Sequence, residues 1–134
     1  MNIREYVKEN GFRIEIVADH GMQTDDDNWQ HHAYTLKLHG VDGETMETPW
    51  MQGAAITKSP TDTVAEVVDS LISDVWSYED ARSFEDWAGE FGYDTDSRKA
   101  EKSYNEIGAM APDVIRVMGG PENFEHVATE IDRL

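Results

Sequence analysis

The sequence predicts an α+β fold in which several helices pack on one face of a three-stranded antiparallel sheet. Two observations lead to this prediction. Before Gly53, apolar and polar residues alternate at 12–18 and 29–41, which is typical of half-buried strands. After Gly53, apolar residues recur every three or four positions, which is typical of amphipathic helices. An antiparallel half followed by a helical half places the helices in one layer on the sheet.

The chain length fits one domain. Its 134 residues lie within the usual range for a single domain with its own core. We therefore expect one domain at 1–134. Residues 1–53 would supply a short N-terminal helix and the sheet, and residues 54–134 the helical half packed on it.

The first half is expected to form a helix, a strand, a loop and a second strand. The helix would span 2–10 and end at Gly11. The strands at 12–18 and 29–41 would be joined by a polar loop at 19–28. Their expected inward-facing residues are Phe12, Ile14, Ile16, Ala18, His32, Tyr34, Leu36 and Leu38.

A hairpin is expected to follow the second strand. Asp42-Gly43 predicts a turn in which both residues take positive φ. The return strand at 44–52 would lie at a sheet edge or carry a bulge, because Pro49 has no N–H to donate. Its core-facing residues would be Met46, Thr48 and Trp50.

The second half predicts four helices, at 61–77, 83–91, 95–118 and from Pro121 onward. Gly92 is expected to end the second of these helices, and Pro112 to kink or break the third. The apolar stripe of the first consists of Val64, Val67, Val68, Leu71, Ile72 and Val75, and that of the last of Phe124, Val127 and Ile131.

The stretch SFEDWAGEFGYDTDSRKAEKSY combines aromatic, acidic and basic residues. We interpret its aromatic residues as the buried stripe of a short helix, with Trp87 packed near Leu71, Phe91 and Tyr104. The carboxylates of Asp94 and Asp96 would lie at the N-terminus of the next helix, where they oppose its dipole. The cations that balance the local acid would be Arg98, Lys99 and Lys102, within helical reach of Asp94 and Glu106.

This stretch also resembles the signature of a family of small, mostly uncharacterised proteins encoded in bacteriophages and prophages. The resemblance is carried by FEDWAGEFGYDTDSRKAEKSY, and it extends back through SPTDTVAEVVDSLISD, METPWMQGAA and NWQHHAYTLKL, over residues 29–118. It implies a mobile-element gene whose product works in the cytoplasm of a bacterial host. The resemblance identifies no catalytic or ligand-binding residue in this chain.

The composition argues against several classes of function. There is no cysteine, which excludes disulfides, thiolate zinc sites and a cysteine nucleophile. No segment approaches the roughly 20 apolar residues of a membrane span. With 28 acidic and 11 basic residues, the net charge of −17 disfavours direct binding to nucleic acid or an anionic membrane. It either attracts basic partners or keeps the chain soluble in concentrated salt.

No motif indicates catalysis, a cofactor or a metal. The acidic 19–28 segment could hold a weak metal site, but TDDDNW lacks the glycine and late glutamate of a calcium loop. His31 and His32 would point to opposite faces of their strand. Hydrolase signatures and phosphate-binding loops are missing from the sequence. We therefore expect neither a cofactor nor an enzyme.

The concentration of acid in the helical half is the strongest functional signal. Between Ser59 and Asp96 eleven carboxylates face one base, Arg82. Asp62, Glu66 and Asp69 are spaced i, i+4, i+7, which places successive carboxylates about 5–6 Å apart along a helix, comparable to backbone phosphates. The predicted contact residues are Asp62, Glu66, Asp69, Asp74, Glu79, Asp80, Glu85, Asp86 and Glu90.

Such a surface predicts a binding protein. The expected partner is a basic host protein that handles nucleic acid or serves in defence, which the chain would inhibit by imitating DNA. Two alternatives stay open: an accessory or structural phage protein whose acidity only provides solubility, and a small enzyme with an unrecognised site.

Overall fold

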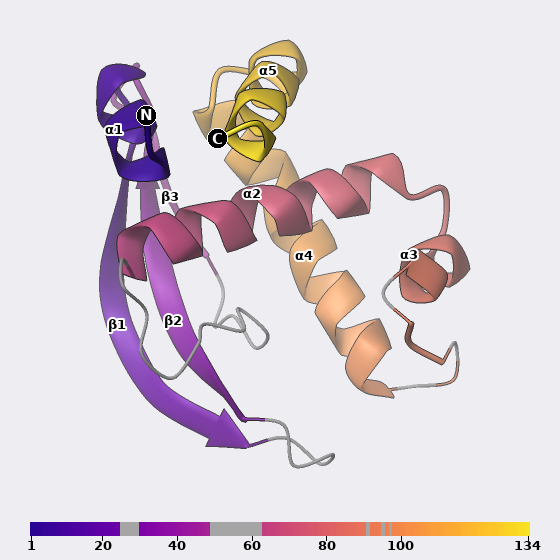
Figure 1. The fold of residues 1–134 in the computed structure, drawn as a ribbon. Coiled ribbons are helices and arrows are strands. Elements are labelled where there is room, and N and C mark those ends of the chain that lie inside the picture. The colour runs from indigo at the N-terminus through magenta and orange to yellow at the C-terminus, as the bar shows by residue number, and fades with distance from the viewer. Residues whose placement is uncertain (25–29, 49–62, 91, 95, 97) are drawn as a thin grey trace.

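The protein has the predicted α+β architecture. The computed structural model describes residues 1–24, 30–48, 63–90, 92–94, 96 and 98–134 (Figure 1). The elements follow the order α1 (Ile3–Glu9), β1 (Arg13–Thr24), β2 (Gln30–His39), β3 (Thr45–Glu47), α2 (Thr63–Asp80), α3 (Phe84–Glu90), α4 (Arg98–Val117) and α5 (Pro121–Asp132).

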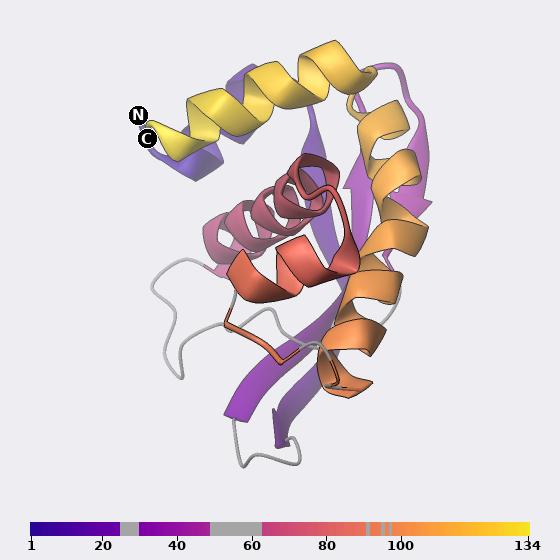
Figure 2. The same ribbon diagram turned by 90° about the vertical axis from the view of Figure 1, so that its right-hand side faces the viewer.

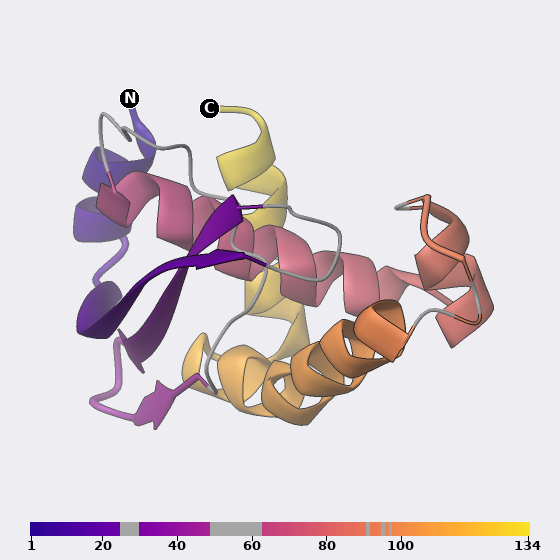
Figure 3. The same cartoon turned by 90° about the horizontal axis from the view of Figure 1, so that it is seen from below.

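The sheet is the predicted antiparallel meander, with strand order β1-β2-β3. α2 crosses the strands and contacts β1, and α4 contacts β2 and β3. α3 lies beyond the end of α2, away from the sheet (Figure 3). α5 turns back from the end of α4, so both chain termini lie on the same side of the molecule (Figure 2).

β1 is longer than predicted. It continues to Thr24, so the loop expected at 19–28 is wrong for its first six positions. The register with β2 shifts between Ile16 and Ala18 and again between Asp19 and Gly21, which are β-bulges. Gly21 takes a φ of 75°, and its N–H donates to the Asp19 carboxylate at 2.8 Å. These bulges interrupt the alternation, which is why the polar stretch did not resemble a strand.

The β2–β3 hairpin is present, but its turn differs from the prediction. The Gly43 N–H donates to the Gly40 carbonyl at 3.2 Å, so Val41 and Asp42 are the central residues of the turn. Gly43 then takes a φ of 83°. The loop therefore has three residues with glycine in the left-handed position, and the expected two-residue turn centred on Asp42-Gly43 is wrong.

β3 is shorter than the strand predicted at 44–52. The ladder ends at Glu47, and the Thr48 side chain then takes over part of the pairing, because its Oγ1 accepts the Leu36 N–H at 2.9 Å. The Thr48 N–H also donates to the Leu36 carbonyl at 2.9 Å. Thr48 is buried, as predicted, while Pro49 and Trp50 lie outside the described residues.

The core lies between the sheet and α2, α4 and α5. Most of the predicted inward residues are buried, and His32, Val64, Val67 and Phe91 lie outside the part of the chain with described side chains. The confirmed residues are Phe12, Ile14, Tyr34, Leu36, Leu38, Met46, Val68, Leu71, Ile72, Val75, Phe124, Val127 and Ile131.

α4 matches the helix predicted at 95–118 except at its start. It begins at Arg98 instead of residue 95, so Asp94 lies before the helix and the helical spacing expected between it and Arg98 does not apply. The helix is not broken at Pro112, where a kink or a break was expected. Pro112 is exposed, while Ala111 and Val114 on either side of it are fully buried. Their packing offsets the hydrogen bond that proline cannot make.

α3 is held by an aromatic cluster and ends as predicted. Gly92 has a φ of 74°, and the Tyr93 N–H donates to the Ala88 carbonyl at 2.8 Å, which is a Schellman cap. Trp87 is 3% exposed, and its ring centroid lies 5.5 Å from that of Tyr104 and 5.7 Å from that of Tyr93. The predicted burial of Trp87 and its packing near Tyr104 are therefore confirmed.

Truncating Trp87 should destabilise the fold strongly. We expect Trp87→Ala to lower the free energy of unfolding by about 3–5 kcal/mol, because it opens a cavity among packed rings. Urea denaturation measures the change. Trp76→Ala, at a tryptophan that is 38% exposed, is the comparison variant and should cost clearly less. Equal losses would contradict the central role of Trp87.

Close packing between α2 and α4 should make Gly108 intolerant of alanine. A methyl group there would lie 2.6 Å from the Tyr78 hydroxyl oxygen and 2.7 Å from its Cζ. We expect Gly108→Ala to cost about 1–3 kcal/mol. Gly89→Ala in α3 is the matched control, because nothing lies within 4 Å of its added methyl. Gly89→Ala should raise the free energy of unfolding by about 0.5–1 kcal/mol, because alanine has the higher helix propensity. If both variants were stabilised, the close contact between Gly108 and Tyr78 would be refuted.

Candidate protein-binding surface

The predicted contact residues lie along two helices, and the structure places most of them. Asp62 lies outside the described residues, and Glu66 belongs to α2 but its side chain is outside the described part. The exposed members are Asp69, Glu79 and Asp80 on α2 and Glu85, Asp86 and Glu90 on α3. Of the three acids expected at i, i+4, i+7 spacing, Asp69 is therefore the one whose side chain is described.

Asp86 has a structural task besides its charge. Its N–H donates to the Ser83 hydroxyl at 3.1 Å, and its carboxylate accepts the Arg82 N–H at 3.2 Å. Together these bonds close the N-terminus of α3, in the manner of a capping box. The presence of an acid at position 86 is therefore explained by its role in capping α3.

Asp74 is set apart from the exposed carboxylates. Its side chain is half-buried, and burial raises its pKa from 3.8 to about 7. Near neutral pH it is protonated in a large fraction of molecules. Asp74 therefore contributes only part of a negative charge near neutral pH.

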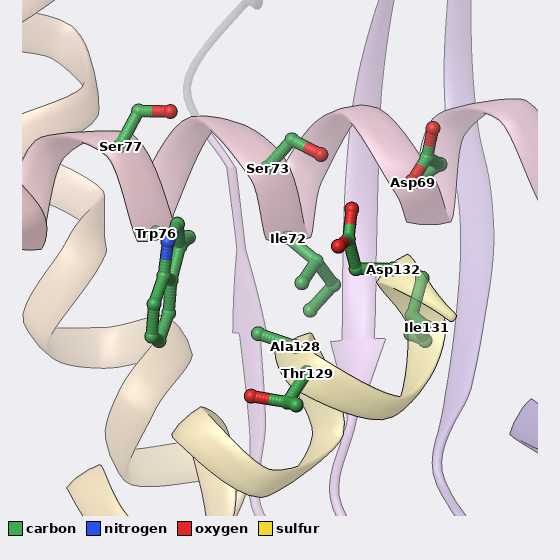
Figure 4. A pocket seen from close by; sticks show the side chains of 9 residues that line it. All are labelled: Asp69, Ile72, Ser73, Trp76, Ser77, Ala128, Thr129, Ile131 and Asp132. Atoms are coloured by element: carbon green, nitrogen blue, oxygen red, sulfur yellow. The ribbon is translucent and has the colours of Figure 1, made fainter. Parts of the chain in front are cut away.

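A groove of about 320 Å³ separates α2 from α5 (Figure 4). Asp69 and Asp132 lie at one end of it, and the indole of Trp76 hangs from α2 at the other. The hydroxyl groups between them belong to Ser73 and Thr129, Ser77 lies next to Trp76, and the floor is formed by Ile72, Ala128 and Ile131. The groove is therefore polar along its walls and closed by an aromatic ring.

A second hollow of about 280 Å³ lies against Trp76 as well. Its apolar lining comes from Ile115, Pro121 and Phe124. Its carboxylates are Glu79, Asp80 and Glu125. Trp76 thus borders both hollows.

We call this region the Trp76 surface. It consists of Asp69, Ser73, Trp76, Glu79 and Asp80 of α2 and Glu125, Thr129 and Asp132 of α5. Positions 69, 73, 76 and 80 follow helical spacing, as do positions 125, 129 and 132. Each stripe adjoins the buried face of its own helix, so the packing of α2 against α5 brings the two stripes together.

No cation among the described residues compensates the charges of the Trp76 surface. Neither hollow has a lysine, arginine or histidine among its described lining residues. Within the described part of the chain, none of the five carboxylates takes part in a salt bridge. Repulsion among these carboxylates raises the free energy of the folded chain, and their negative charge attracts cations.

The outer face of the sheet shows the opposite arrangement. Glu15 accepts from His39 at 3.0 Å and lies 3.6 Å from the Arg13 guanidinium. The side chains of Trp29 and His31 lie outside the described part. Among the described side chains, no three that could ligate a metal ion come together. The expected balance of acid and base on α4 is seen at Lys102 and Glu106, whose charged atoms are 4.0 Å apart.

Sequence reasoning missed Trp76 and the contribution of α5. The signals were present: a tryptophan at i+7 from Asp69, and Glu125, Thr129 and Asp132 beside the apolar stripe of the last helix. Neither signal says which helices become neighbours. That information comes only from tertiary packing.

No described helix is both long and apolar enough to cross a bilayer.

The raised pKa of Asp74 should make stability fall as pH rises. Between pH 3.8 and about 7 the unfolded chain has lost this proton while the folded chain keeps it, so ionisation favours unfolding. We expect Asp74→Asn to raise the free energy of unfolding at pH 8 by about 1–3 kcal/mol, a range reduced because the side chain keeps some contact with water.

Urea denaturation at pH 5 and pH 8 measures this effect. The gain should shrink at pH 5, where the folded wild-type chain keeps the Asp74 proton. Asp69→Asn, one turn earlier and exposed, is the control and should change little at either pH. A gain of the same size at both pH values would contradict a raised Asp74 pKa.

Comparisons with protein-family models, with curated proteins and with solved structures find no significant match to this chain.

Proposed function

We propose that this chain works by binding a basic protein through its acidic helical surface. The observation that carries the proposal is the group of exposed carboxylates that border the two hollows beside Trp76 and have no salt-bridge partner among the described residues. A partner that brings lysine or arginine to this surface would relieve their mutual repulsion. Complementary charge also speeds encounter between two proteins.

The narrower proposal concerns the kind of partner. A basic groove that binds nucleic acid displays lysine and arginine at spacings suited to phosphates. Carboxylates along α2 and α3, together with those of α5, can occupy such a groove. We propose that the partner is a nucleic-acid-handling or defence protein of a bacterial host, which this chain inhibits, in keeping with the resemblance to phage-encoded proteins.

Neutralising part of this surface should weaken binding without harming the fold. We expect Asp69→Asn/Asp80→Asn to lose most of the basic proteins that the wild-type chain captures from nuclease-treated bacterial lysate. Its free energy of unfolding should stay equal or rise slightly, because two repelling charges are removed. Quantitative mass spectrometry of the captured proteins measures the loss.

The matched control is Glu9→Gln/Glu47→Gln, which removes the same charge from α1 and β3. It should capture the same proteins as the wild type. Capture should also fall between about 0.1 M and 1 M salt, as the Debye length shrinks from about 10 Å to 3 Å, and added duplex DNA should compete. Equal capture by both double variants, or capture that ignores salt, would count against the acidic surface. DNA that does not compete would remove the narrower proposal.

A further inference from the structure

Trp76 is an apolar side chain placed where α2 is otherwise polar. It is 38% exposed, whereas Trp87, the other tryptophan in the described part of the chain, is 3% exposed. The buried stripe of α2 is complete without it, since Val68, Leu71 and Val75 are fully buried. An exposed indole between two hollows is typical of a residue that anchors a partner.

The surroundings of Trp76 define the chemistry of what it can bind. Figure 4 shows the indole at one end of the α2–α5 groove and the carboxylates of Asp69 and Asp132 at the other. The second hollow adds Glu79 and Asp80 beside the ring. Aromatic rings attract cations at their faces, and nearby carboxylates add a direct charge interaction.

We propose that Trp76 is the docking point for an arginine side chain of the basic partner. The planar guanidinium stacks on an indole while its N–H groups donate to neighbouring carboxylates, which the compact ammonium of lysine does less well. The ring would hold the guanidinium plane, and Asp80 or Glu79, which border the same hollow as the ring, would accept from its edge. This inference rests on the proposed function, because it names the group by which that partner is recognised.

Charge also decides between the possible occupants. A second copy of this chain would bring another net charge of −17 to a surface that is itself acidic. Nucleic acid would be repelled for the same reason. A cationic protein segment is the occupant whose charge complements both hollows.

Short peptides test the inference without a known partner. The probes are blocked tetra-arginine and tetra-lysine peptides, titrated calorimetrically into the protein at about 50 mM salt. The wild type should bind tetra-arginine more tightly than tetra-lysine. Trp76→Leu keeps the apolar bulk and all charges but lacks the ring, and it should weaken tetra-arginine binding by about three- to tenfold and remove the preference for arginine.

Trp76→Phe retains a smaller ring and should keep part of the preference, which separates loss of the ring from loss of packing. Thermal unfolding shows whether each variant is folded. The Trp76 indole N–H signal in an NMR spectrum should shift on titration with tetra-arginine.

The outcomes distinguish this inference from the proposal beneath it. If Trp76→Leu binds both peptides like the wild type while Asp69→Asn/Asp80→Asn weakens both, the acidic surface binds cations and Trp76 is not the anchor. If Asp69→Asn/Asp80→Asn also binds like the wild type, the proposed function fails as well. Sedimentation that shows a wild-type dimer and a monomeric Trp76→Leu variant would overturn the inference in favour of a second copy.

Discussion

Burial of one face of α2 is the interaction on which the rest of the structure depends. α2 contacts β1, α1, α4 and α5, so four parts of the chain are arranged around it. Val68, Leu71 and Val75 are fully buried, and each such side chain contributes about 1.5–3 kcal/mol. Because these contacts fix the rotation of α2 about its axis, they also fix where its polar stripe points. Asp69, Ser73 and Trp76 therefore face α5.

The class and order of the elements could be predicted from the sequence, because they depend on local periodicity. Alternation placed Ile14, Leu36 and Leu38 in the core, and spacing of three and four placed Val68 and Leu71 there. The errors arose where a local rule was overridden. The bulges after Ile16 and Asp19 carried β1 past the point where alternation ends.

The candidate site was predictable only in part, because it is made by two helices that are distant in the sequence. The sequence alone predicts exposed acids on α2, because a helix with one face buried exposes its charged residues on the other. These acids are Asp69, Glu79 and Asp80. Asp132 and Glu125 become their neighbours only when α5 packs on α2. Asp74 is a residue that composition wrongly assigns to the acidic surface. Its position in the helix suggested an exposed acid, but burial raises its pKa to about 7.

The distribution of the few cations bears on why the surface is acidic. Arg13 pairs with Glu15 on the sheet, Arg116 with Glu44 and Asp113, and Lys102 with Glu106. None of these pairs lies at the hollows beside Trp76. Acidity that served only solubility could be spread over the whole surface and would need no exposed indole at its centre. Carboxylates that have no salt-bridge partner in the described part of the chain, grouped around an exposed tryptophan, instead combine a charge that attracts a basic protein with an apolar contact that can hold it. This combination favours a surface that acts by contact.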